Sequence, residues 1–306
     1  MTAPLYVRSA YVGAALEITV YTDNENVFDR FGLIFTDPGV NPDVTEKLDI
    51  FTVTKIPDEM MSGPAQSTGR AVHSSDFIEI YEDGDLRHGG YFGKAWSVGD
   101  YNQGRVVVSF PMIEHYQPDF PAINVFRPII ESLLIGAGRV SLHASSAAIN
   151  GKAVIMSGFR GSGKSTLLDK LLLSGGDFLA DDRTMLGNKN GEIIVETFPE
   201  HLRRSHSVLE PKTRIRPDLT IEGADPGALF LLMRDESIPP SVRKISPSEA
   251  AAQLMLGLPV HYEHAHFELA ADMIMQLCIQ SQSYILSGWG DSEESKNLVL
   301  EVMDSL

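Results

Sequence analysis

Hydrophobic and polar residues alternate along much of the first 118 residues, as in the segments 16–22 (LEITVYT), 49–55 (DIFTVTK), 77–83 (FIEIYED) and 105–110 (RVVVSF). A period of two is typical of strands that bury one face. Turn-forming residues separate these segments, for example DNEN at 23–26 and the pair Gly89-Gly90. The pattern predicts a β-rich N-terminal domain over residues 1–118.

The hydrophobic pattern changes after residue 118. In the segment 119–138 (DFPAINVFRPIIESLLIGAG), apolar residues recur at helical spacing and two glycines close the run. We therefore predict a helix here, a boundary near residues 117–119, and a second domain over residues 119–306.

Strand and helix patterns alternate in the second domain. Asn150-Gly151 separates two apolar runs, which predicts a tight hairpin, and a second hairpin is expected near residues 188–191. Further strands are expected at 178–182 (FLADD) and 228–233 (ALFLLM). Helices are expected after the glycine-rich segment at 158–165 and over 246–257, 268–280 and 292–306. The alternation predicts an α/β domain.

Composition supports a two-domain globular protein. The chain has 306 residues, of which 43% are apolar and 22% charged. Its formal net charge of −16 disfavours nonspecific binding to nucleic acid or to an anionic membrane. The single cysteine, Cys278, excludes an intrachain disulfide and a thiolate-rich metal site. We find neither a signal peptide pattern nor an apolar run of membrane-spanning length, and we expect a cytoplasmic protein.

Residues 158–165 (GFRGSGKS) fit the phosphate-loop, or Walker A, pattern G-x-x-x-x-G-K-[ST]. An apolar strand pattern precedes the loop and a helix pattern follows it, so backbone N–H groups and a helix N-terminus can converge on a phosphate. Lys164 is expected to contact the β and γ phosphates and Ser165 to bind Mg²⁺. The predicted nucleotide-binding residues are Gly158, Arg160, Gly161, Ser162, Gly163, Lys164, Ser165 and Thr166.

Asp181 and Asp182 end the predicted strand FLADD, which we expect to run parallel to the strand before the loop and next to it. Consecutive strand residues point to opposite faces, so the two carboxylates should have different roles. We assign Asp181 to the Mg²⁺ side and Asp182 to proton acceptance from an attacking hydroxyl. The reversed assignment stays open, as does a solvated turn without a role in catalysis.

These features together resemble the catalytic domain of the HPr kinase/phosphorylase family. The shared features are His143, fifteen residues before Gly158, the loop with Lys164 and Ser165, seventeen residues from Lys164 to Asp181, and the sequence LADDR at 179–183. The resemblance implies the phosphoenolpyruvate-carboxykinase-like variant of the phosphate-loop fold, Asp182 as proton acceptor and His143 in the active site. It also makes a homo-oligomer plausible.

The resemblance extends to the pair Arg243 and Lys244, which stands where the family has an arginine near the phosphates. Two features depart from the family: Thr166 replaces the usual acidic residue, and residues 1–118 do not resemble its N-terminal domain. Glu196 and Glu200 are the nearest candidates for the family's acidic metal ligand after the aspartates. The chain is more similar to divergent members from bacterial peptide-modifying gene clusters, including kinases of lasso-peptide precursors.

The sequence therefore predicts an ATP- and Mg²⁺-dependent kinase that phosphorylates a hydroxyl, with a serine of a peptide or protein as the acceptor. The β-rich N-terminal domain would recognise that acceptor. Two alternatives stay open. A small-molecule kinase would use the same loop and base, and a noncatalytic ATP-binding regulatory protein would use the aspartates only for the metal.

Overall fold

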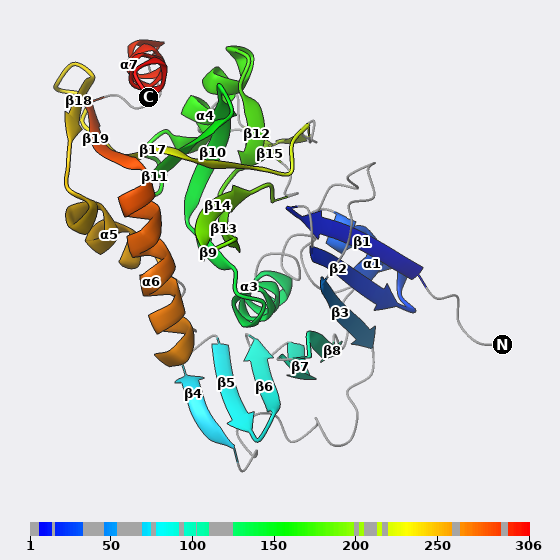
Figure 1. The fold of residues 1–306 in the computed structure, drawn as a ribbon. Helices are drawn as coiled ribbons and strands as arrows, with labels where there is room; N and C mark the ends of the chain where they lie inside the picture. Colours follow the sequence, from blue (N-terminus) through cyan, green and yellow to red (C-terminus); the bar gives the residue numbers. More distant parts are fainter. Residues whose placement is uncertain are drawn as a thin grey trace. The chain divides into compact units, whose positions relative to one another are not determined.

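The computed structural model describes residues 6–13, 16–32, 46–53, 69–74, 78–91, 95–101, 103–109, 125–198, 202–204, 213–215, 220–258, 264–288 and 293–306. The chain is a mixed α/β protein (Figure 1). It forms two compact units: Met1–Gly138 with Pro259–Glu268, and Arg139–Leu258 with Leu269–Leu306. The domain boundary expected between residues 118 and 119 lies outside the described residues and stays a prediction.

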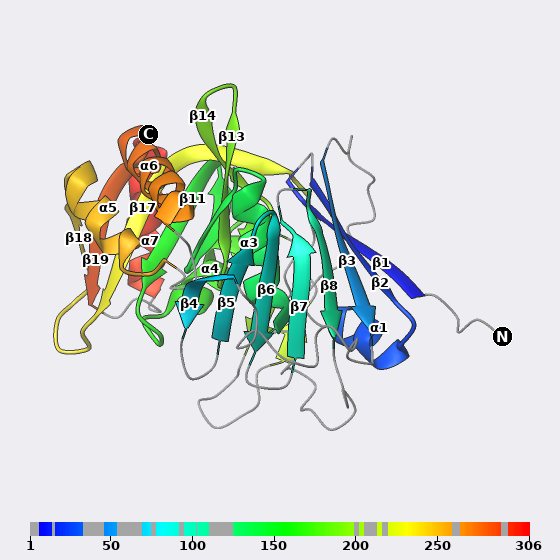
Figure 2. The same ribbon diagram turned by 90° about the horizontal axis from the view of Figure 1, so that it is seen from below.

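The first unit contains an eight-stranded mixed sheet in the order β1-β2-β3-β8-β7-β6-β5-β4. Strand β3 pairs in parallel with both β2 and β8, whereas the other pairs are antiparallel. Figure 2 shows these strands side by side in this order. The β-rich character predicted for this part of the chain is confirmed. The strands are β1 (Tyr6–Val12), β2 (Leu16–Thr22), β3 (Glu46–Val53), β4 (Arg70–Ser74), β5 (Ile78–Asp83), β6 (Leu86–Tyr91), β7 (Ala95–Asp100) and β8 (Arg105–Ser109).

The segment DNEN at 23–26 ends strand β2, as predicted, but it leads into a helix, and the turn predicted at Gly89-Gly90 is wrong. Helix α1 (Glu25–Gly32) begins within DNEN, because the Asn24 side chain accepts a hydrogen bond from the Val27 N–H and so caps the helix. Gly89 and Gly90 lie inside strand β6. A Cβ atom at Gly89 would lie 2.5 Å from the Tyr91 hydroxyl oxygen, so a larger residue there would have to displace this buried side chain.

The helix predicted over residues 119–138 is helix α3 (Arg127–Gly136), and residues 119–124 lie outside the described part. Pro128 occupies the first turn, where its missing N–H costs nothing. The side chains from Pro128 to Ile135 are buried, which makes α3 a core element of its unit.

The second unit contains a nine-stranded sheet among the described residues. Its main path is β12-β10-β11-β17-β14-β13-β9, and β17 also pairs with β19, which pairs with β18. Strands β11, β17 and β19 are parallel, whereas β10 is antiparallel to both β11 and β12. The strands are β9 (Val140–Leu142), β10 (Ala144–Ile149), β11 (Lys152–Gly158), β12 (Asp177–Ala180), β13 (Thr184–Lys189), β14 (Glu192–Glu196), β17 (Gly223–Arg234), β18 (Ser241–Lys244) and β19 (Gln282–Gly288). A separate short pair joins β15 (Leu202–Arg204) to β16 (Thr213–Ile215).

The predicted hairpin between β10 and β11 is confirmed. Asn150 and Gly151 have φ values of 53° and 76°, as a two-residue hairpin turn requires. The second predicted hairpin joins β13 to β14 through Asn190 and Gly191, which also have positive φ. The first of these turns sets the register of β11, the strand that leads to the glycine-rich segment.

Helices α4 (Lys164–Leu173) and α7 (Glu293–Asp304) share one hydrophobic core with the sheet. Leu167, Leu168 and Leu171 of α4 pack in this core with alternate residues of β11 and β17, such as Met156 and Phe230. Because both faces of the central parallel strands are buried, their sequences are continuously apolar. This packing fixes the direction in which α4 leaves the loop after β11.

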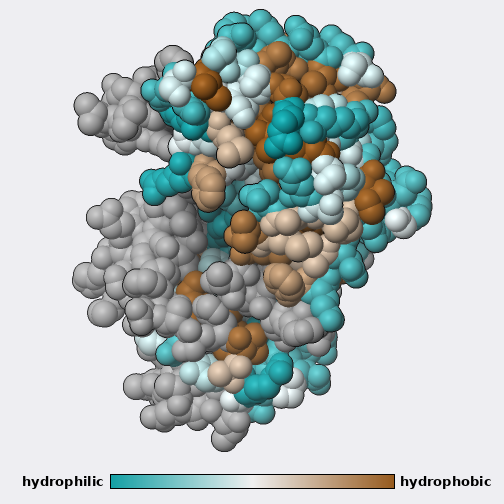
Figure 3. Space-filling view, turned by 90° about the vertical axis from the view of Figure 1, so that its left-hand side faces the viewer, coloured by the Kyte–Doolittle hydropathy of each residue, from teal (hydrophilic) through white to brown (hydrophobic). Residues whose placement is uncertain are grey.

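The remaining predicted helices are confirmed as α5 (Pro247–Met255) and α6 (His264–Gln280), the latter beginning four residues earlier than expected. Burial raises the pKa of the Cys278 thiol on α6 to about 12, which keeps it protonated near neutral pH. No helix among the described residues is long and apolar enough to cross a bilayer. Figure 3 shows one face of the chain, on which hydrophobic residues form separate patches among hydrophilic ones.

The two faces of α4 give a test of this packing. Leu171→Ala should lower the free energy of unfolding by about 2–5 kcal/mol, because Leu171 is fully buried and its loss leaves a cavity. The matched control, Leu173→Ala, removes the same atoms from a side chain that is 86% exposed and should cost less than about 0.5 kcal/mol. Urea denaturation followed by circular dichroism measures both, and equal losses would contradict the buried face assigned to α4.

Candidate active site

The glycine-rich segment forms a loop between strand β11 and helix α4 at the carboxyl end of the parallel strands. Gly163 precedes α4 with a φ of 95°, a left-handed conformation that favours glycine. A Cβ atom at Gly158 would lie 2.8 Å from both the Leu232 carbonyl oxygen and the Ser162 hydroxyl oxygen. The two glycines are therefore required by the path of the loop.

Lys164 lies at the start of α4 with its side chain folded into the loop. Only 7% of the residue is exposed, and Nζ donates hydrogen bonds to the carbonyl oxygens of Gly158 (2.7 Å) and Phe159 (3.3 Å). A buried ammonium needs such acceptors because desolvation is costly. The loop thus holds a cation on its inner side, close to the N-terminus of a helix that favours anions.

The other predicted loop residues lie in different environments. Ser162 is buried, and its hydroxyl has no hydrogen-bond partner within the described part of the chain. Arg160, Gly161 and Thr166 are exposed at the loop and on the first turn of α4. The structure therefore brings Lys164 and Ser162 to the inside of the loop and leaves Arg160 and Thr166 at its surface.

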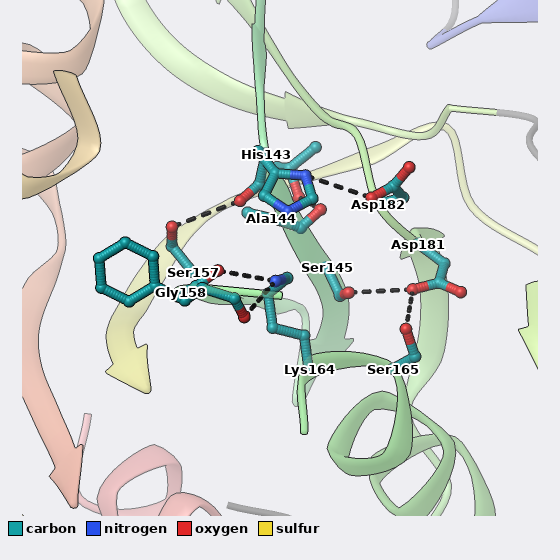
Figure 4. Close-up of polar contacts among 11 residues, drawn as sticks. His143, Ala144, Ser145, Ser157, Gly158, Lys164, Ser165, Asp181 and Asp182 are labelled. Atoms are coloured by element: carbon teal, nitrogen blue, oxygen red, sulfur yellow. Dashed lines mark hydrogen bonds and ion pairs between the residues drawn. The ribbon is translucent and has the colours of Figure 1, made fainter. Parts of the chain in front are cut away.

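Asp181 connects the loop to the next part of the site (Figure 4). The residue is 3% exposed, and its Oδ1 accepts hydrogen bonds from the Ser165 hydroxyl (2.9 Å) and the Ser145 hydroxyl (3.0 Å). Ser165 lies on the first turn of α4 and Ser145 on strand β10. Two elements distant in sequence therefore meet at one carboxylate oxygen.

Asp182 pairs with His143, the histidine singled out from the sequence. Nδ1 of His143 lies 3.2 Å from Oδ1 of Asp182, and the side chains are 36% and 29% exposed (Figure 4). The Ser157 hydroxyl donates to the His143 carbonyl oxygen at 3.4 Å. When Nδ1 carries its proton and donates it to Asp182, the imidazole fixes the orientation of this more exposed carboxylate.

The prediction that the two carboxylates lie on opposite faces of a strand is wrong. Strand β12 ends at Ala180, and the backbone bends at both aspartates. Asp182 has a φ of 80°, in the left-handed region where aspartate is one of the few tolerated residues. As a result, Asp181 and Asp182 contact Ser145 and His143, which are two residues apart in one segment.

The expected neighbour of the loop strand is also different. Strand β12 runs in the same direction as β11, as predicted, but β10 lies between them and pairs with both. Strand β17 is the parallel neighbour of β11 on its other side. Asp181 reaches Ser165 from the edge of the sheet because the first turn of α4 extends toward it.

The donor set suits Mg²⁺ held together with a nucleotide. Asp181 supplies a buried carboxylate and Ser165 a hydroxyl, which are the oxygen ligands that Mg²⁺ prefers. No group of three or more His, Cys, Asp or Glu side chains able to hold a metal occurs among the described residues. The arrangement fits a site that phosphate oxygens and water would complete, as is usual for Mg²⁺ with nucleotides.

Arg243 and Lys244 lie away from the loop. They belong to β18, which is separated from β11 by β19 and β17, a distance of about 14 Å at the usual strand spacing. Arg243 lies 3.4 Å from Glu249, and Lys244 donates to Gln282. Their assignment to nucleotide binding stays a prediction that these contacts do not support.

Glu196, a candidate acidic ligand, forms a buried ion pair with Arg139 at 3.0 Å. The Glu196 carboxylate is thus bound by the Arg139 guanidinium. It also packs against Gly187, where an added Cβ atom would lie 2.6 Å from the carboxylate. The other candidate, Glu200, lies outside the described residues.

Sequence patterns did not reveal two residues of the site, Ser145 and Arg234. Arg234 ends strand β17, and its Nη1 donates to the Gly161 carbonyl oxygen at 2.9 Å. Glu236 holds the same guanidinium through two hydrogen bonds. Neither Ser145 nor Arg234 belongs to a sequence motif. Their positions at the site follow only from the order and register of the strands.

No protein-family model matches the chain, and no curated protein matches it. Among solved structures, the HPr(Ser) kinase/phosphatase from Coxiella burnetii is similar at 14% identity and a TM-score of 0.33. The match covers 54% of this chain and 88% of that chain. The likeness is too distant to assign an activity.

The contact between Arg234 and the loop gives a prediction. Arg234→Met should raise the hydrogen-exchange rate of the Ser162 amide about fivefold, because the loop loses a charge-assisted hydrogen bond worth about 1 kcal/mol at a partly exposed site. Hydrogen exchange read by mass spectrometry over residues 158–163 measures this change.

Arg160→Met is the matched control, because it makes the same substitution at an exposed position of the same loop. It should leave the exchange of the loop amides unchanged. Equal exchange in the two variants would show that the Arg234 hydrogen bond does not restrain the loop.

Proposed function

We propose that the chain is an ATP-dependent kinase that transfers the γ-phosphoryl group to a hydroxyl, namely the serine hydroxyl of a peptide or protein. The loop amides and Lys164 hold the phosphates. Ser165 and Asp181 would hold Mg²⁺, which neutralises charge on the phosphates when bound. Asp182, oriented by His143, accepts the proton of the acceptor.

The observation that carries the proposal is the hydrogen bond between Ser165 and Asp181, at 2.9 Å. A glycine-rich loop alone indicates phosphate binding and nothing more. Here the hydroxyl that follows the loop lysine lies against a buried carboxylate, which is the pairing that a nucleotide-bound Mg²⁺ requires. Two sequence segments sixteen residues apart thus form one candidate metal site.

The different exposures of the two aspartates support their different roles. Asp181 is almost fully buried and bound by two hydroxyls, so it suits a fixed metal ligand. The side chain of Asp182 is 29% exposed, so a hydroxyl from outside can reach it. His143 contacts Asp182, the proposed base, which suits a residue that orients this carboxylate.

The reaction follows from these positions. The acceptor oxygen forms a bond to the γ-phosphorus while the bond from the γ-phosphorus to the bridging oxygen of ADP breaks. The proton of the acceptor hydroxyl passes to a carboxylate oxygen of Asp182, and ADP leaves with the bridging oxygen. Lys164 remains beside the phosphates and balances the charge that moves toward ADP.

The choice of serine in a peptide or protein rests on the resemblance to peptide-modifying members of the HPr kinase/phosphorylase family. The loop and aspartates are compatible with any hydroxyl acceptor. The acceptor is therefore the part of the proposal that the experiment below must identify directly.

The role of Asp182 leads to a prediction. Asp182→Asn should lower phosphoryl transfer at least about 100-fold, because an amide cannot accept the acceptor proton. The dissociation constant for Mg·ATP should stay within about threefold, since Lys164, Ser165 and Asp181 are unchanged. Asparagine tolerates the left-handed backbone at this position, so the substitution should preserve the bend.

The assay uses ATP labelled in its γ-phosphate, Mg²⁺, a library of serine peptides, each with an alanine counterpart, and a separate panel of small hydroxyl compounds. Asp177→Asn, at the other end of β12, is the matched control and should transfer at the wild-type rate. Equal rates for Asp182→Asn and Asp177→Asn would refute the assignment of the base. Transfer only to small hydroxyl compounds would favour a small-molecule kinase, and nucleotide binding without any transfer would favour a regulatory protein.

A further inference from the structure

Ser145 has a buried hydroxyl that none of the roles above uses. The residue is fully buried on strand β10, and its Oγ donates to Oδ1 of Asp181 at 3.0 Å. The Ser165 hydroxyl donates to the same oxygen at 2.9 Å. Figure 4 shows Asp181 between these two serines.

Ser145 and Asp181 lie in different kinds of structure. Ser145 lies in a strand that pairs on both sides, with β11 and with β12. Asp181 lies one residue beyond the end of β12, where the backbone bends. The hydrogen bond from Ser145 therefore ties the carboxylate to a strand that is paired on both sides.

Ser165 has a second task that Ser145 does not share. The Ser165 hydroxyl oxygen would bind a nucleotide's divalent cation through a lone pair. The hydroxyl proton must then point away from the cation. If Ser165 were the donor that alone positioned Asp181, metal binding would disturb the carboxylate. A second hydroxyl, buried and outside the loop, keeps Oδ1 in place while Ser165 adjusts.

We infer that Ser145 is a positioning residue for the metal-binding carboxylate of Asp181, and that it raises affinity for the divalent cation of a metal–nucleotide complex without touching the nucleotide. The inference rests on the proposed function, because it concerns the metal site of that function. It extends the site to strand β10, where no sequence motif marks a role for Ser145.

Ser146 provides a matched control. It is the next residue of β10, it is equally buried, and its Oγ accepts a hydrogen bond from Thr184 at 3.1 Å. Thr184 also donates to the Ala144 carbonyl oxygen, so it keeps an acceptor when Ser146 is replaced. Ser145→Ala and Ser146→Ala thus remove the same atom from adjacent strand residues, and only the first removes a contact to Asp181.

The experiment measures binding of a fluorescent ATP analogue to the full chain, once with Mg²⁺ and once with a chelator, together with Mn²⁺ binding by electron paramagnetic resonance. Ser145→Ala should lose about tenfold in affinity for the metal–nucleotide complex and for Mn²⁺. Its affinity for the metal-free analogue should equal that of the wild type. Ser146→Ala should match the wild type in all three measurements.

A purely structural role predicts a different result. If Ser145→Ala weakens binding equally with and without metal, or behaves like Ser146→Ala, the inference is overturned. Ser145→Cys, which is close in size and retains a weak donor, should fall between Ser145→Ala and the wild type, and it replaces the alanine variant if that variant does not fold. If the wild type shows no metal-dependent nucleotide binding, the proposed function fails as well, and this outcome is distinct from the others.

Discussion

The candidate site depends on strand β10 running antiparallel between β11 and β12. Ala144 pairs with Ser157 near the end of β11, and Ser146 pairs with Ala180 at the end of β12. The start of β10 therefore lies beside the carboxyl ends of the two strands that lead to the loop and to the aspartates. This register places His143 and Ser145 at the site. Neither residue belongs to β11 or β12: Ser145 lies in β10, and His143 immediately precedes that strand.

Within this frame, each charged group of the site is already bound by polar neighbours. The ammonium of Lys164 is held by two loop carbonyls, and the carboxylate of Asp181 by two hydroxyls. Because two hydroxyls already position Asp181, little reorganisation would be needed at this carboxylate when a cation binds, whereas Lys164 would exchange a loop carbonyl for a phosphate oxygen. In a chain with a net charge of −16, Lys164 places positive charge locally at the loop, as the proposed phosphate binding requires, whereas the guanidinium of Arg234 is paired with Glu236.

The sequence predicts the parts of the site that depend on local conformation. Asn150-Gly151, the glycine loop and the helix after it are encoded by residues whose backbone preferences are strong, and the structure has all three. The arrangement of Asp181 and Asp182 was mispredicted because strand β12 ends at Ala180, two residues before the end of the strand predicted over 178–182. Ser145 and Arg234 could not be predicted, since their roles come from strand order and register, which a single sequence does not specify.

The central claim is that the loop and Asp181 together form a site for a nucleotide with its metal. The most direct test is a crystal structure of the chain with Mg²⁺ and a nonhydrolysable ATP analogue. We predict that the Lys164 ammonium contacts the phosphates in place of the Gly158 carbonyl, and that Mg²⁺ lies on the Ser165 hydroxyl beside Asp181. An analogue bound elsewhere, or a metal out of reach of Asp181, would contradict the account.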